Sequence, residues 1–147
     1  MKLATKCVML MMFMAAVMAS TGAYAKKVKK NLYVFGCSAS FTDSLVYITD
    51  IQVMENVGYD TKMKMLADRD AYSGQLKQYF ADKRNQPHRT CLVMFSDNEK
   101  EINKKRNKLK TLYTVKSPGK YDVRYISNDE FSFTVIKDDE EESSAGE

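Results

Sequence analysis

Histidine and cysteine are scarce in this chain of 147 residues, which contains one histidine and three cysteines. A zinc site built from several histidines is therefore excluded. Cys37 and Cys91, the cysteines beyond the first 25 residues, do not have the spacing of zinc ligands. No C-x-x-C motif is present, which argues against thioredoxin-like redox chemistry. The single histidine, His88, follows a proline and is interpreted as a loop residue, and we expect neither a metal nor a cofactor.

Glycine is infrequent as well, with six residues, and no glycine-rich phosphate-binding motif occurs. The segment Gly36–Ser40 differs from the G-x-S-x-G nucleophile motif of serine hydrolases in its last residue, where serine replaces glycine. A catalytic pair of Cys91 and His88 would need an exposed thiol, whereas Cys91 lies in an apolar run. We therefore predict no catalytic residue. An enzyme with its site in the serine-rich loop Cys37–Ser44 is kept as an alternative.

The chain has a single extended apolar run, Cys7–Ala19. Its length of about 13 residues is less than the roughly 20 residues that a helix needs to span a bilayer. Two lysines precede the run, and small residues follow it, with Ala23 and Ala25 in the A-x-A pattern of a cleavage site. We predict a signal peptide over residues 1–25, cleaved before Lys26. The mature chain is then periplasmic or extracellular and has no transmembrane segment, and an uncleaved membrane anchor is the alternative.

Charge is distributed unevenly along the rest of the chain. Residues 26–137 carry 21 basic and 13 acidic side chains, whereas residues 138–147 carry six acidic side chains and no basic one. The closing segment has no apolar content that would offset the entropy of ordering it, so we predict a disordered acidic tail. Residues 26–137 have the size of a single domain with its own core.

Within this domain, strand-like and helix-like apolar patterns succeed one another. Strands are expected over residues 32–35, 45–54, 90–95, 121–125 and 131–135, and helices over residues 62–83 and 99–113. Residues 90–95 are apolar without alternation, which is typical of a strand covered on both faces. Ser96 and Glu99 after it match a capping box. The basic segment Lys26–Lys30 is expected to be a flexible lead-in, and residues 56–60 to end the second strand.

The order β-β-α-β-α-β-β is not a regular alternation of parallel units. It predicts an α+β domain with a mixed or mainly antiparallel sheet and helices packed on it in two layers. A three-layer α/β sandwich with one helix on each face is the alternative, and it accounts better for the apolar run over residues 90–95.

Cys37 follows one expected strand and Cys91 begins another. In an oxidising compartment, cysteines on neighbouring strands can form a disulfide when their Cα atoms lie about 4.4–6.8 Å apart. Two separately buried thiols are the alternative, because cysteine is among the most buried residue types. A reactive thiol is the third interpretation, and it would require exposure.

The second expected helix carries a run of cations. Its basic residues are Lys100, Lys104, Lys105, Arg106, Lys108 and Lys110. Outside the cytoplasm such a helix is not expected to meet nucleic acid, but it can bind anionic glycans or lipid headgroups. A solvated helix face is the simpler interpretation.

Taken together, these patterns predict a small exported bacterial protein without catalytic activity that acts as a binding or accessory module in the periplasm or at the envelope. The sequence does not identify the partner, and the candidates are an envelope protein and anionic glycans or lipid headgroups. Electrostatic binding of anionic surfaces through residues 100–110 is an alternative function.

Overall fold

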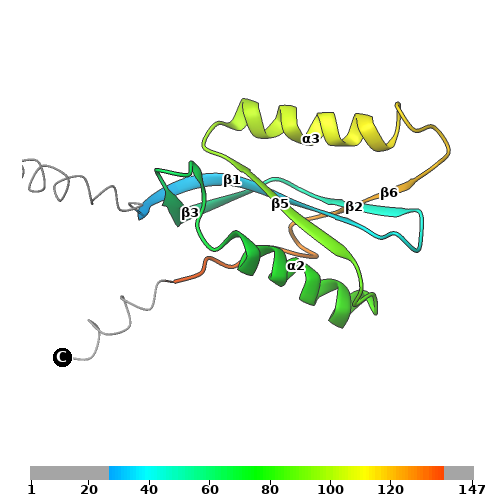
Figure 1. Ribbon diagram of the computed structural model, residues 1–147, viewed down its shortest axis with the longest axis horizontal. Coiled ribbons are helices and arrows are strands. Elements are labelled where there is room, and N and C mark those ends of the chain that lie inside the picture. The colour runs from blue at the N-terminus through cyan, green and yellow to red at the C-terminus, as the bar shows by residue number, and fades with distance from the viewer. Residues whose placement is uncertain (1–26, 138–147) are drawn as a thin grey trace, which may run out of the picture.

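The computed structural model describes residues 27–137, which form one sheet of six strands with a helix on either side (Figure 1). The elements are β1 (Lys27–Ala39), β2 (Leu45–Thr49), β3 (Gln52–Asp60), β4 (Met65–Leu66), α2 (Arg69–Arg84), β5 (Thr90–Ser96), α3 (Glu99–Tyr113) and β6 (Asp122–Ile126). The expected signal peptide, 1–25, and the expected acidic tail, 138–147, lie outside the described residues.

The sheet is organised around β1. The strand order is β4-β3-β1-β2-β6, and β5 pairs with β1 in addition. Ser38 pairs with Tyr47 of β2 and with Cys91 of β5, so these two strands lie on opposite edges of β1. β2 and β6 are parallel, whereas the other pairs are antiparallel. The α+β class and the mixed, mainly antiparallel sheet are therefore confirmed.

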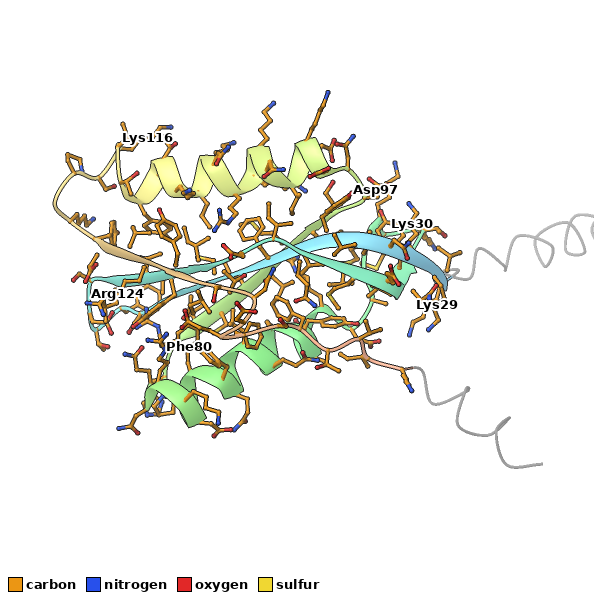
Figure 2. The ribbon with its side chains drawn as sticks, turned by 180° about the vertical axis from the view of Figure 1, so that it is seen from behind. Lys29, Lys30, Phe80, Asp97, Lys116 and Arg124 are labelled. Atoms are coloured by element: carbon orange, nitrogen blue, oxygen red, sulfur yellow. The ribbon has the colours of Figure 1, made fainter. Side chains whose placement is uncertain are left out.

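The two helices cover opposite faces of the sheet (Figure 1). Tyr72, Leu76 and Phe80 of α2 pack with Leu32 and Val34 in one core cluster, and Phe80 points from the helix towards the strands (Figure 2). On the other face, a second cluster surrounds Ile102 of α3. Its buried members from the strands are Phe35, Cys37, Val46 and Ile48. The layers are thus those of the three-layer alternative, and the expected two-layer packing is wrong.

β1 is longer than the expected strand over residues 32–35. Its first residues, Lys27–Lys30, pair with Gly58, Asp60 and their neighbours in β3 and are not a flexible lead-in. Its last residues, Cys37–Ala39, pair with β2 and β5 instead of forming a loop. Pairing on the sheet overrides the local polarity of both ends, because strand preference depends on the neighbours that a segment finds.

The second expected strand, 45–54, is divided at Asp50 and Ile51 into β2 and β3. β3 then continues through the expected break at residues 56–60, where Asn56 adopts a positive φ of 53° opposite a shift of register in β1. An extra residue in one strand of an antiparallel pair forms a β-bulge, and the pairing resumes beyond it.

The first helix starts later than expected. Residues 61–68 form a turn and the short strand β4. α2 begins at Arg69 and ends at Arg84, and its C-cap, Asn85, has a positive φ of 53°. In α3, the expected capping box of Ser96 and Glu99 is shifted. Asn98 is the N-cap, and its side chain accepts hydrogen bonds from the backbone N–H groups of Lys100 and Glu101.

The last expected strand, 131–135, is extended but does not join the sheet. Two glutamine side chains hold it instead. Gln52 donates to the carbonyl of Phe133 at 2.8 Å and accepts from its N–H at 2.7 Å. Gln75 makes the same pair of bonds to Thr134, both at 2.8 Å. These amides supply the hydrogen bonds that a neighbouring strand would otherwise provide.

Candidate ligand-binding site

A pocket of about 530 Å³ lies between β5 and α3. Its lining residues are Arg69, Val93, Met94, Phe95, Lys105, Lys108, Leu109, Leu112 and Lys116. We call this pocket the β5–α3 groove. Its floor is apolar and is formed by the side chains of Met94, Leu109 and Leu112 together with the edge of β5 at Val93 and Phe95. Its rim carries four cations, and no acidic residue of the described part of the chain lines it.

The groove forms because β5 is an edge strand and α3 passes over only part of it. Met94 and Leu109 turn inward and pack against the second core cluster. Leu92 and Leu112, by contrast, remain 50% and 47% exposed. Isolated exposed leucines are ordinary on protein surfaces, but Leu112 lines this groove and Leu92 lines a second pocket on the other side of β5.

Two of the rim cations are held by backbone carbonyls of β5. Lys105 Nζ donates to the carbonyl oxygen of Phe95 at 3.1 Å. From the other side, Arg69 Nε donates to the carbonyl oxygen of Val93 at 3.2 Å. Both carbonyls belong to the strand edge that faces away from β1, so these side chains satisfy groups that an edge strand otherwise leaves unpaired.

The other two rim cations, Lys108 and Lys116, are exposed. Lys116 follows the C-terminal end of α3 (Figure 2). Neither ammonium group makes an ion pair with an acidic side chain within residues 27–137. An apolar floor below uncompensated cations suits a ligand that has apolar groups and negative charge together.

The structure separates the six cations expected to form one basic surface. Lys105 and Lys108 line the β5–α3 groove. Arg106 turns inward, where it donates to the carbonyl of Thr49 at 3.0 Å and to Asp50 at 3.2 Å. Lys110 lies over the ring of a β6 tyrosine. The outer side of α3 keeps Lys100, Lys104 and again Lys108, which line a shallow pocket of about 690 Å³.

The disulfide considered as one of three possibilities is not formed: Cys37 and Cys91 are free. Cys37 pairs with Leu92, and Cys91 pairs with Ser38. Since successive residues of a strand point to opposite faces, the two thiols lie on opposite sides of the sheet. Cys37 packs in the cluster under α3 and Cys91 beside the cluster under α2. The alternative of separately buried thiols therefore describes Cys37, whereas Cys91 is half-buried.

Burial also determines the chemistry of Cys37. Desolvation, followed by the nearby Cys91 thiol, raises the pKa of Cys37 from 9.0 to about 12, and Arg89 opposes this only in part. Burial likewise raises the pKa of Cys91. A thiol with a raised pKa carries little thiolate at neutral pH and is a poor nucleophile.

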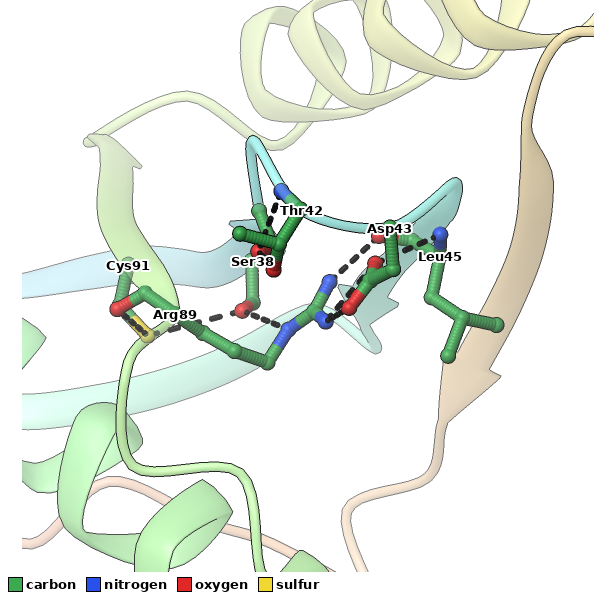
Figure 3. A network of polar contacts seen from close by, with 7 residues as sticks. Ser38, Thr42, Asp43, Leu45, Arg89 and Cys91 are labelled. Atoms are coloured by element: carbon green, nitrogen blue, oxygen red, sulfur yellow. Dashed lines mark hydrogen bonds and ion pairs between the residues drawn. The ribbon is translucent and has the colours of Figure 1, made fainter.

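The expected alternative site, Cys37–Ser44, is organised around a residue that the sequence patterns did not indicate, Arg89 (Figure 3). Its guanidinium group donates to Ser38 Oγ at 2.9 Å, to Asp43 at 3.1 Å and to the carbonyl of Leu45. The group also lies 4.9 Å from the ring of Tyr47. Each of the three guanidinium nitrogens donates within the protein, so we interpret this network as structural.

The remaining hydrogen bonds of that loop are also internal. The hydroxyls of Ser40 and Thr42 lie 2.8 Å apart, and Asp43 accepts from the N–H of Leu45 at 2.9 Å. His88 is exposed on the turn before β5, as the sequence predicts. Among the described residues, no group of three or more His, Cys, Asp or Glu side chains is placed to hold a metal ion.

Within residues 27–137, neither helix has the length and apolarity needed to cross a membrane. Comparisons with known proteins find no matching family model, no matching curated protein and no matching solved structure. The β5–α3 groove and its charges are therefore the features that indicate a function.

Proposed function

We propose that this chain is an exported, non-catalytic binding module that captures an acidic, partly apolar polypeptide segment of an envelope protein in the β5–α3 groove. The observation that carries the proposal is the combination of an apolar floor with a rim of four cations and no acidic residue. Export is supported by the signal-peptide pattern of residues 1–25.

The two parts of the groove contribute differently to binding. Burying a leucine-sized side chain on the floor contributes about 1.5–3 kcal/mol. An ion pair at an exposed rim contributes about 0–1 kcal/mol and is weakened by salt. The floor therefore supplies most of the affinity. The cations select acidic ligands and speed their association.

The test uses a fluorescently labelled peptide, Glu-Ser-Leu-Ser-Glu-Ser-Leu-Ser-Glu, and a double variant of the protein. Lys108→Glu with Lys116→Glu reverses two rim charges that make no ion pair within the described residues. Fluorescence anisotropy is expected to show binding to the unmodified protein and a loss of about tenfold or more in the variant. A peptide with lysine in place of glutamate should not bind.

The matched control is Lys100→Glu with Lys104→Glu. It makes the same change of net charge on the same helix, but on its outer side and away from the groove. Peptide affinity is expected to change less than threefold, an order-of-magnitude allowance for long-range electrostatics. Equal losses in the two double variants, or no binding by the unmodified protein, would overturn the proposed function.

A second candidate function is favoured by the outer side of α3. Lys100, Lys104 and Lys108 line its shallow pocket together with polar uncharged residues, without an acidic one. Such a face fits an anionic surface of phosphates or carboxylates. Sedimentation with phosphatidylglycerol vesicles tests it: binding should be lost in the Lys100→Glu, Lys104→Glu variant and at high salt. Binding that survives both conditions removes this candidate.

A further inference from the structure

The outer edge of β5 is accessible in the part of the chain that the structure describes. β5 pairs through seven residues with β1 and with no other described strand. Its outward carbonyls at Val93 and Phe95 are occupied by the side chains of Arg69 and Lys105, not by backbone N–H groups. Long cationic side chains of this kind are a common way of protecting an edge strand, and they can move aside without unfolding any element.

A pocket lies on each side of this edge. The β5–α3 groove borders the face under α3. A second pocket, of about 760 Å³, borders the face towards β4 and the start of α2. Val93 and Arg69 line both pockets, which places the edge of β5 between them. Because side chains of a strand alternate between faces, a chain lying along β5 would direct successive side chains into the two pockets in turn.

We propose that the acidic segment binds as an added β-strand along the outer edge of β5, displacing the side chains of Arg69 and Lys105. This inference rests on the proposed function and specifies the binding mode of the same site. Backbone N–H groups of the segment take over the carbonyls of Val93 and Phe95, so no carbonyl is left unsatisfied. The released cations lie beside the carboxylates of the segment.

The pockets also define the sequence of such a segment. Positions facing α3 carry apolar and acidic residues, because that groove combines an apolar floor with cations. Positions facing the second pocket carry small polar residues, because it contains Asp60, Asp68 and Asp70 beside Lys27 and Arg69. A second copy of this chain is disfavoured as the occupant, since it would bring one cationic rim against another.

The test uses two N-methylated versions of the same peptide. One carries N-methyl groups on serines and the other carries an equal number on the intervening leucine and glutamate residues. In an extended strand, alternate N–H groups point to opposite edges, so only one set faces β5. Strand addition therefore predicts a loss of about tenfold or more in one version and little change in the other.

Two outcomes would overturn the added strand. Equal affinities of the two methylated versions, with binding still lost in the Lys108→Glu, Lys116→Glu variant, would show that the groove binds side chains without backbone pairing. A dimer in light scattering that the peptide does not dissociate would show that a second copy occupies the edge. In contrast, no binding of the unmethylated peptide is a failure of the proposed function itself.

Discussion

Arg89 and Asp43 form an ion pair of 3.1 Å between side chains of very different exposure, 2% for the arginine and 39% for the aspartate. The arginine is the buried partner, and its charge is compensated by Asp43 together with Ser38 Oγ and the carbonyl of Leu45. A buried guanidinium group is tolerated only when its donors are satisfied in this way. The pair joins the loop after β1 to the start of β5.

The first prediction is that Arg89→Ala lowers the free energy of unfolding by about 3 kcal/mol or more, because it removes several charge-assisted hydrogen bonds and leaves a cavity. Urea denaturation followed by circular dichroism measures the change. Arg124→Ala is the control, since its pair with Asp122 is exposed on both sides, at 57% and 50%. Similar shifts of the urea midpoint in the two variants would contradict a structural role for the Arg89 network.

The second prediction compares two glycines. A Cβ atom at Gly36 of β1 would lie 2.6 Å from Leu76 Cδ2 and 3.2 Å from Phe133 Cζ, whereas one at Gly74 of α2 meets nothing within 4 Å. Gly36→Ala should therefore destabilise the protein by about 1–3 kcal/mol through overpacking. Gly74→Ala should stabilise it by about 0.5–1 kcal/mol, as in other exposed helix positions. Thermal denaturation of both variants checks the opposite signs, and a stabilising Gly36→Ala would refute the close packing of α2 on β1.

Local patterns in the sequence predicted the elements whose core faces are continuous. The strand over residues 90–95 and a helix within residues 62–83 were predicted correctly, and the helix buries Tyr72, Leu76 and Phe80 at helical spacing. The expected cover on both faces of the strand was wrong, because β5 lies at an edge of the sheet and Leu92 is 50% exposed. The ends of β1 were not predicted, because Lys27–Lys30 are strand only through their partners in β3. Likewise, the choice between two and three layers depends on which side of the sheet each helix crosses.

The candidate site, too, could be predicted from the sequence only in part. The six cations of α3 were visible in the sequence, but their separation between the groove, the core side and the outer side depends on the position of β5. Lys116 lies beyond the helix and was not recognised as part of the set. The role of Arg89 was missed because its partner Asp43 is 46 residues away in the sequence. An isolated arginine beside a strand gives no local signal of burial.

The third prediction concerns pH. Burial raises the pKa of Cys37 from 9.0 to about 12, so in alkaline solution its thiol ionises in the unfolded chain before it does in the folded one. The unfolded state then binds fewer protons, and stability falls as the pH rises through this interval. Relative to Cys37→Ala, the protein should lose about 1.4 kcal/mol per pH unit between about pH 9.5 and 11. The urea stabilities of the two proteins should run parallel below pH 8, and parallel curves above pH 9.5 would rule out this contribution of Cys37.

The fourth prediction concerns export and the thiols together. The intact mass of the protein from fractionated cells should correspond to a chain starting at Lys26, because residues 23–25 fit a signal peptidase site. Denaturing alkylation without prior reduction should label both Cys37 and Cys91, since the thiols point to opposite faces of the sheet. Under native conditions Cys91 should react first, because Cys37 is only 5% exposed. An uncleaved mass in the membrane fraction would contradict export by cleavage. Label that appears only after reduction would instead contradict the positions of the two cysteines.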